Sequence, residues 1–277
     1  EDGGINRNVE DEFTQQLKFI VNPLEGWNIY LEGAMRNSNY NQKEEVIPIY
    51  NYNINDEPML RNSDYGTRQY VTNWRGRGEY YSINAYTDYS RSFGKHNGKV
   101  LVGLNYEHYN SDSMTGRGYD LTTTDKPFLS QTLKDHIATD SYWHRATAGY
   151  FGRLNYDYDG KYLAEFNIRY DGSSRFLADK RWAWFPSVSL GWNIAREEFF
   201  EKLSETIGTL KLRGSWGMIG NQDVGTDRFV STLSTATDSW IINGAKVSST
   251  GMPTIVSSAL SWEKVTTLDL GFDARFF

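Results

Sequence analysis

The stretch Phe151–Trp192 decides the fold, and it reads FGRLNYDYDGKYLAEFNIRYDGSSRFLADKRWAWFPSVSLGW. From Tyr162 to Tyr170 every second residue is apolar or aromatic, and the residues between them are polar except Leu163. Successive side chains of a strand point to opposite faces, so this pattern predicts a strand with one apolar face and one polar face. The function depends on whether a protein core or a lipid bilayer covers the apolar face.

Composition excludes several classes of protein. The net charge of −6 argues against a nucleic-acid-binding surface, and zero cysteines exclude disulfides and cysteine-based metal sites. Mean hydropathy is −0.62, and no apolar run is long enough for a membrane-spanning helix. These values do not exclude a membrane β-barrel, because the strands of such a barrel expose only alternate residues to lipid. The N-terminal sequence EDGG does not resemble a signal peptide, so either the mature chain begins here or, as we expect, the sequence is a piece of a longer protein.

Period-2 alternation recurs along the chain and predicts about nine strands, most of them about 9–12 residues long. Strands of that length suit a tilted crossing of a bilayer. The predicted strands are Glu12–Val21, Trp27–Arg36, Tyr80–Ser90, Lys99–His108, Arg145–Tyr158, Lys161–Tyr170, Ala183–Ile194, Leu210–Met218 and Trp262–Asp273.

Short and long connections alternate along most of the chain, which is typical of outer-membrane barrels with short periplasmic turns and long extracellular loops. Asn22–Gly26 and Asp159-Gly160 read as the short turns, and the second is a good hairpin signal. The long loops are predicted at 37–79, 109–144 and 219–261. Within Ala195–Leu203 the alternation is interrupted, which predicts a short helix there.

Aromatic rings bracket smaller apolar residues on one face of three predicted strands. The bracketing pairs are Tyr81 and Tyr89, Tyr162 and Tyr170, and Trp184 and Trp192. Rows of aromatic side chains at both membrane interfaces are characteristic of membrane barrels. The alternative is a soluble β-sandwich, propeller or fibre-like domain, but connections of about 40 residues are uncommon in such compact folds.

No residue pattern indicates an enzyme or a metal site. The four histidines (His96, His108, His136 and His144) have no ligand spacing and read as ordinary surface or rim residues. The sequence NSDSM at 110–114 begins like a calcium loop but lacks the later ligands. The sequence DGSSR at 171–175 reads as a turn at a strand end rather than a ligand site.

Aromatic residues of the predicted long loops are the candidate substrate contacts. Flat rings near hydrogen-bonding groups suit sugar faces and would also suit peptides, although packing or lid contacts would explain them equally well. The candidates are Trp74, Tyr119, Tyr142, Trp143 and Trp240.

Several motifs, joined in order between Tyr150 and Phe277, closely resemble the SusC/RagA family of TonB-linked outer-membrane transporters of Bacteroidota. They are YFGRLNYDY at 150–158, RYDGSSRF at 169–176, FPSVSLGW at 185–192, LRGSWG at 212–217 with GNQ at 220–222, and LSWEK at 260–264. A weaker match, including SFGKH at 92–96, covers the first half of the chain.

The resemblance implies an antiparallel transmembrane β-barrel of about 22 strands, with the lumen filled by a plug domain. We therefore expect residues 1–277 to be a partial barrel domain, with the plug and the TonB-contacting segment absent from this chain. The family further implies import of an oligosaccharide or oligopeptide across the bacterial outer membrane without cofactor or covalent chemistry. The implied partners are a SusD-like surface lipoprotein, the TonB–ExbB–ExbD energy-transducing complex and outer-membrane lipid.

The same reading assigns polar strand residues to the lumen, where they would contact the plug. They are Arg153, Asn155, Asp157, Glu165, Asn167, Arg169, Lys211 and Arg213. Two alternatives to the transporter stay open at this point. One is a soluble secreted glycan-binding β-sandwich, and the other is a surface-exposed structural or adhesive barrel.

Overall fold

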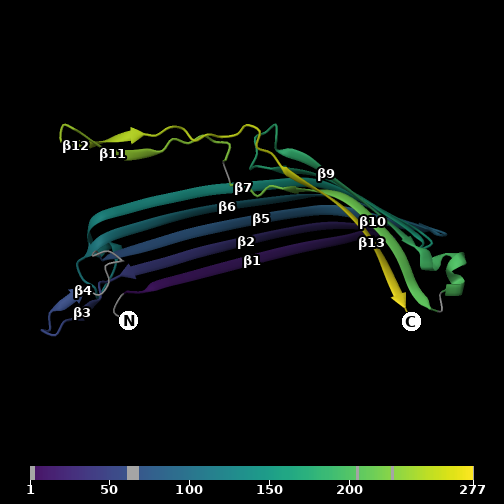
Figure 1. Ribbon diagram of the computed structural model, residues 1–277, viewed down its shortest axis with the longest axis horizontal. Helices are drawn as coiled ribbons and strands as arrows, with labels where there is room; N and C mark the ends of the chain where they lie inside the picture. Colours follow the sequence, from purple (N-terminus) through teal and green to yellow (C-terminus); the bar gives the residue numbers. More distant parts are fainter. Residues whose placement is uncertain (1–3, 61–68, 204–205, 226–227, 277) are drawn as a thin grey trace. The chain divides into compact units, whose positions relative to one another are not determined.

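The computed structural model describes residues 4–60, 69–203, 206–225 and 228–276, without the side chains of Leu60 and residues 237–239. Its largest sheet has nine strands in the order β1-β2-β5-β6-β7-β8-β9-β10-β13 (Figure 1). The strands are β1 Asn6–Leu24, β2 Trp27–Val46, β5 Tyr70–Phe93, β6 His96–Leu121, β7 Thr132–Tyr158, β8 Tyr162–Ser173, β9 Trp182–Asn193, β10 Ile207–Asn221 and β13 Glu263–Phe276.

Two small hairpins and three 3-10 segments fill the connections. The hairpins pair β3 (Tyr50–Tyr52) with β4 (Pro58–Leu60) and β11 (Thr235–Ile242) with β12 (Ala245–Thr250). The 3-10 segments are η1 Leu129–Gln131, η2 Ile194–Arg196 and η3 Glu198–Leu203. The last two confirm the short helical interruption after β9. No helix among the described residues is long and apolar enough to cross a membrane.

The number of strands in the main sheet agrees with the prediction, but several predicted boundaries are wrong. β5, β6 and β7 have 24, 26 and 27 residues, so they extend well into the segments predicted as long loops. Apolar alternation marks only strands with an apolar face. In their extensions these strands carry polar residues on both faces, so hydropathy alone does not reveal them.

The chain divides into two compact units. The first comprises residues 1–16, 34–81 and 108–144, and the second comprises residues 17–33, 82–107 and 145–277. β1, β2, β5, β6 and β7 contribute residues to both units.

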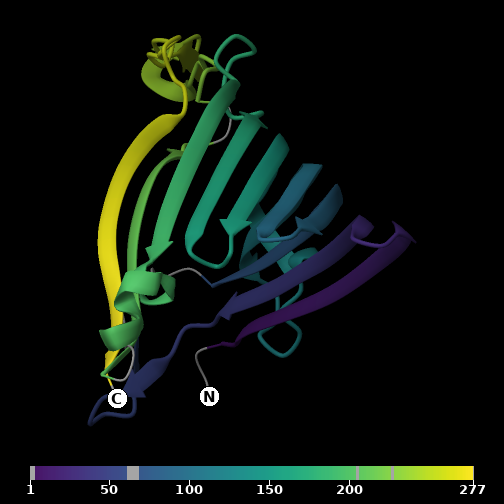
Figure 2. The same ribbon diagram turned by 90° about the vertical axis from the view of Figure 1, so that its right-hand side faces the viewer.

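In the second unit the alternation of apolar and polar residues continues from strand to strand. Phe166 pairs with Leu154 of β7 and Val188 of β9, and Leu212 of β10 pairs with Phe272 of β13. Figure 2 shows β13, in yellow, running beside β10, in green. We call this surface the apolar face, formed by Leu154, Tyr156, Tyr162, Ala164, Phe166, Ile168, Val188, Leu190, Leu212, Trp216, Leu268, Leu270 and Phe272.

Large side chains of the apolar face are exposed rather than packed in a core. Phe166 is 44% exposed, Leu190 62% and Leu270 82%. A soluble β-sandwich would cover this surface with a second sheet. The described residues instead form one large sheet with this face uncovered, as predicted for a barrel wall.

Aromatic rings gather at both ends of the apolar face across β7, β8 and β9. At one end Tyr170 stacks on Trp184 with ring centroids 4.4 Å apart, and Trp182 stacks on Tyr150 at 6.1 Å. At the other end Tyr162 stacks on Trp192 at 6.5 Å. The structure thus places two of the three predicted pairs, Tyr162 with Tyr170 and Trp184 with Trp192, in two rows with smaller apolar residues between them.

The short turns have the predicted hairpin geometry. Asp159 and Gly160 both have positive φ, 55° and 64°, as the type I′ turn requires. Gly26 has φ 77° in the turn between β1 and β2, where a Cβ would lie 2.3 Å from the Ser90 carbonyl oxygen. Both positive φ and close packing therefore favour glycine there.

The sequence DGSSRF forms the wall of a small core at the opposite end of β8. Phe176 is fully buried, and Ser173 is 1% exposed. Arg175 donates from Nη1 to the carbonyl oxygen of Gln222, at 2.8 Å. The burial of Phe176 and Ser173 and the hydrogen bond of Arg175 support the prediction that this segment has a structural role and is not a ligand site.

Candidate functional site

Polar side chains form a hydrogen-bonded network on the face of β7 and β8 opposite the apolar face. Arg153 Nε donates to Asn167 Oδ1 at 2.6 Å, and Asn167 Nδ2 donates to Glu165 Oε1 at 2.8 Å. Asn155 Nδ2 donates to Glu165 Oε2, also at 2.6 Å. We call this surface the polar face.

The other residues predicted to face the lumen lie on the same surface. Arg169 is paired with Asp171 at 2.8 Å, and Arg213 with Asp273 at 3.4 Å. Asp157 accepts a hydrogen bond from Asn97 Nδ2 at 2.8 Å. The strand register places Lys211 opposite Asp273. All eight residues therefore share one face of the sheet.

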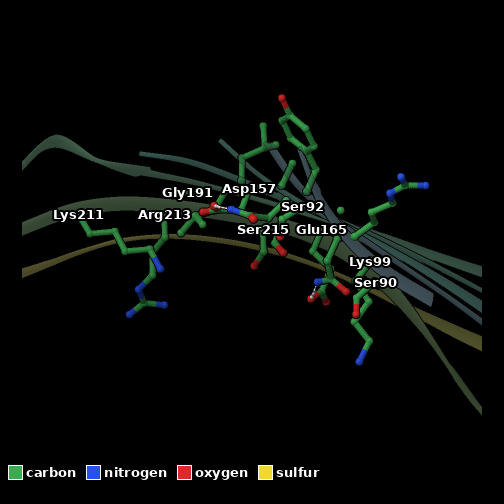
Figure 3. Close-up of a pocket in the computed structure, with 18 of the residues that line it drawn as sticks. Ser90, Ser92, Lys99, Asp157, Glu165, Gly191, Lys211, Arg213 and Ser215 are labelled. Carbon is green, nitrogen blue, oxygen red and sulfur yellow. Dashed lines mark hydrogen bonds between the residues drawn. The ribbon is translucent and has the colours of Figure 1, made fainter. Parts of the chain in front are cut away.

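A cavity of about 1120 Å³ opens on the polar face. Figure 3 shows Lys99, Glu165, Lys211, Arg213 and Ser215 projecting to one side of the sheet at this cavity. Its lining carries carboxylate, ammonium, guanidinium, amide and hydroxyl groups. Such a surface can make many hydrogen bonds to a polar ligand or to another protein segment.

Sequence reasoning missed part of this face on β1, β2, β5 and β6. Tyr30 stacks on Tyr86 with centroids 4.5 Å apart, and the Tyr86 hydroxyl donates to Glu32 at 3.0 Å. Lys18 pairs with Glu32 at 2.7 Å. Gly103 makes room for this group, because a Cβ there would lie 2.5 Å from Tyr86 Cβ. The signal that could have assigned these residues to the polar face is the period-2 alternation of their strands.

A second cavity, of about 310 Å³, lies in the first unit around Trp74. Its lining residues are Gln42, Glu44, Thr72, Trp74, Thr115 and Arg117. The Trp74 ring lies over Gly76, where a Cβ would be 2.8 Å from the ring, and it contacts Tyr40 with centroids 6.0 Å apart. Arg117 Nε donates to Thr72 Oγ1 at 2.8 Å. The cavity thus combines an aromatic ring with amide, carboxylate, hydroxyl and guanidinium groups.

The remaining aromatic candidates do not gather at this cavity. Tyr119 contacts Tyr70 at 5.7 Å, Trp143 contacts Tyr109 at 4.9 Å, and Tyr142 contacts His144 at 5.8 Å. Trp240 lies on the β11–β12 hairpin and is 73% exposed. Four of the five candidates lie on the long strands and not in loops, which corrects their predicted placement.

A carboxylate secures the connection between β9 and β10. Glu197 accepts hydrogen bonds from Trp192 Nε1 at 3.0 Å and from Lys161 Nζ at 3.2 Å. A hydrogen bond from the Tyr162 hydroxyl, followed by that from Trp192, lowers the pKa of Glu197 below its ordinary value of 4.5. The segment is therefore attached to the aromatic row formed by Tyr162 and Trp192.

Comparison with known proteins identifies a family that matches nearly the whole chain. Residues 2–277 match the family model described as TonB dependent receptor-like, beta-barrel. The TonB-dependent receptor SusC of Bacteroides thetaiotaomicron is 36% identical over 199 residues, covering 70% of this chain and 19% of SusC. The TonB-dependent receptor P3 of Formosa agariphila is 31% identical over 196 residues, covering 69% of this chain and 19% of the relative.

Solved structures share the fold. The RagAB peptide importer in its closed-closed state aligns with a TM-score of 0.81 at 22% identity, over 98% of this chain and 29% of the matched chain. The open-open state gives a TM-score of 0.79 at 22% identity, over 98% of this chain and 28% of that chain. The chain spans about a fifth of the length of the curated relatives it matches.

Proposed function

Since this chain belongs to the TonB-dependent receptor-like β-barrel family, we propose that it forms part of the barrel wall of a SusC-like importer in the bacterial outer membrane. The homologues are receptors and transporters, not enzymes. The proposed activity is active import of oligosaccharides, with oligopeptides as the alternative cargo.

The exposed apolar face between two aromatic rows carries this proposal. Exposed Phe166 and Leu270 would be unfavourable in water but favourable against acyl chains. The rings at the two ends, including Trp184 and Trp192, match the preference of amphipathic aromatics for the membrane interface. Lipid would therefore cover one face and water or protein the other.

The polar face supports the second half of the proposal. Charged and amide side chains, among them Glu165 and Arg213, surround the cavity of about 1120 Å³. In a plugged barrel such side chains would contact the plug, whose displacement through TonB and ExbB–ExbD would open a path. A SusD-like lipoprotein would capture cargo outside the cell.

The Trp74 cavity favours an oligosaccharide over a peptide. A flat indole suits the apolar face of a sugar ring, and Gln42, Thr72 and Arg117 offer hydrogen bonds to hydroxyl groups. The two charged groups of the lining, Glu44 and Arg117, pair with each other at 3.8 Å, so their charges balance and the lining suits a neutral, hydroxyl-rich cargo.

Uptake by the full-length protein tests the proposal. A deletion strain should lose growth on one class of oligosaccharide, and the intact gene should restore it. The protein should be found in the outer-membrane fraction and require detergent for extraction. Solubility without detergent would contradict the barrel assignment, and loss of growth on oligopeptides alone would contradict the proposed cargo.

A further inference from the structure

We propose that His108 and His144 form an open binding site for a divalent transition-metal ion. The two residues lie on β6 and β7, and both belong to the first unit. Their imidazole rings lie side by side, with centroids 6.3 Å apart and planes 34° apart. Their spacing in the sequence gives no sign of this contact, which strand pairing creates.

The geometry suits two imidazoles sharing one ion. Metal–nitrogen bonds to histidine are about 2.0–2.1 Å long, so two nitrogens bound to one ion lie about 3–4 Å apart. The two ring centroids are 6.3 Å apart, and we expect small side-chain rotations to bring one nitrogen of each ring to this separation. His144 is exposed and His108 half-buried, so an ion can enter from solvent.

The surroundings define an open site and not a closed one. Among the described residues, no group of three or more His, Cys, Asp or Glu side chains is placed to hold a metal. Tyr142 contacts His144 with ring centroids 5.8 Å apart, so an aromatic ring borders the site on one side. Asn110, two residues beyond His108, is bound to Glu79 at 3.2 Å, and Glu79 also pairs with Arg77. Because Asn110 and Glu79 are engaged with each other and with Arg77, water would complete the coordination of the ion.

Ligand type predicts which ions bind. Imidazole is a good ligand for Cu²⁺, Ni²⁺ and Zn²⁺, and affinities of a given site peak at Cu²⁺ along the first-row series. With only two protein ligands, we expect Cu²⁺ to bind more tightly than Ni²⁺ or Zn²⁺. Mg²⁺ and Ca²⁺, which prefer oxygen ligands, should not compete.

The other two histidines supply matched controls. His96 Nδ1 lies 2.8 Å from the Tyr156 hydroxyl, and His136 Nε2 lies 2.8 Å from the Thr132 hydroxyl. Each of these rings already has a hydrogen-bonding partner. Their replacement should leave the proposed site intact.

Titration of the full-length protein with Cu²⁺ tests the proposal. The protein is purified in detergent with an affinity tag that lacks histidine, and binding is followed by calorimetry and electron paramagnetic resonance. Replacing even an outer-shell partner of a metal ligand commonly weakens binding about 10–100-fold. We therefore expect His108→Ala and His144→Ala each to lower Cu²⁺ affinity at least on the order of tenfold. The spectrum should change from two coordinated nitrogens to one.

The control variants His96→Ala and His136→Ala should retain wild-type Cu²⁺ affinity. His144→Gln, which keeps a polar side chain of similar size, should lose binding without loss of the fold, as judged by circular dichroism. If the double variant His108→Ala/His144→Ala binds Cu²⁺ as tightly as wild type, the proposal is wrong. A wild-type spectrum with a single coordinated nitrogen would overturn it as well.

Discussion

The ring of Phe176 packs against Trp262 with centroids 5.5 Å apart, and this contact joins the turn after β8 to the residue preceding β13. Trp262 also meets Phe185 of β9 at 5.2 Å, and its Nε1 donates to the carbonyl oxygen of Arg181 at 2.7 Å. Gly220 leaves room for these rings, since a Cβ there would lie 2.2 Å from Phe185. Motifs that are distant in the sequence thus meet in one small core.

We expect Phe176→Ala to destabilise the protein by about 3–5 kcal/mol, because it leaves a cavity where a fully buried ring was. The free energy of unfolding of the full-length protein, measured by urea titration in lipid vesicles, checks this value. Phe199→Ala is the control, since Phe199 is 68% exposed, and its effect should stay within about 0.5 kcal/mol. Equal losses in the two variants would contradict the assigned core.

Gly103→Ala should destabilise the second unit by about 1–3 kcal/mol through overpacking. The added Cβ would lie 2.6 Å from Phe151 Cζ and 2.9 Å from the carbonyl oxygen of Ala85. Gly98→Ala on the same strand is the matched control, because its Cβ would meet nothing within 4 Å. Thermal unfolding should show a lower midpoint for the first variant only. An unchanged midpoint for both would show that Tyr86 and Phe151 move aside freely.

Stability should depend on pH through Glu197. Its pKa is lower in the folded protein than its ordinary value of 4.5, so its hydrogen bonds stabilise the fold fully above that pH. This contribution is lost as pH falls through the lower, folded-state pKa. The stability difference between wild type and Glu197→Gln should therefore shrink from pH 7 to pH 3. A difference that stays constant over that range would show that the Glu197 carboxylate is not the group responsible.

Trp74→Ala should weaken cargo binding on the order of tenfold, a typical cost for truncating a well-packed aromatic contact of a binding site. Trp74→Phe keeps an aromatic ring over Gly76 and should recover part of the affinity. Calorimetry with an oligosaccharide that supports growth measures both effects. Unchanged affinity in Trp74→Ala at normal surface expression would show that this cavity does not bind the cargo.

The strands with an apolar face could be predicted from the sequence, and so could the face each residue occupies. Alternation around Phe166 indicated the strand and its two faces, and Asp159-Gly160 indicated the turn, because a strand with two unlike faces has a strong period-2 signal. The placement of Arg153 and Glu165 on the polar face follows from the same pattern.

The outer parts of β5, β6 and β7 could not be predicted in this way. Trp74 and Tyr119 stand among polar and glycine residues on both faces, so no hydrophobic alternation marks their strands. The cavity around Trp74 and the contact between His108 and His144 depend on pairing between distant strands. Such pairing is set by the whole sheet and not by local sequence.

The most direct test of the barrel assignment compares two neighbouring residues of β9. Val188 lies on the apolar face opposite Phe166, whereas Ser189 lies on the polar face opposite Glu165. In vesicles, Val188→Arg should cost about 2–4 kcal/mol of folding free energy, because it places a charge in acyl chains. Ser189→Arg should cost much less. Equal costs for the two variants would contradict the claim that lipid covers the apolar face.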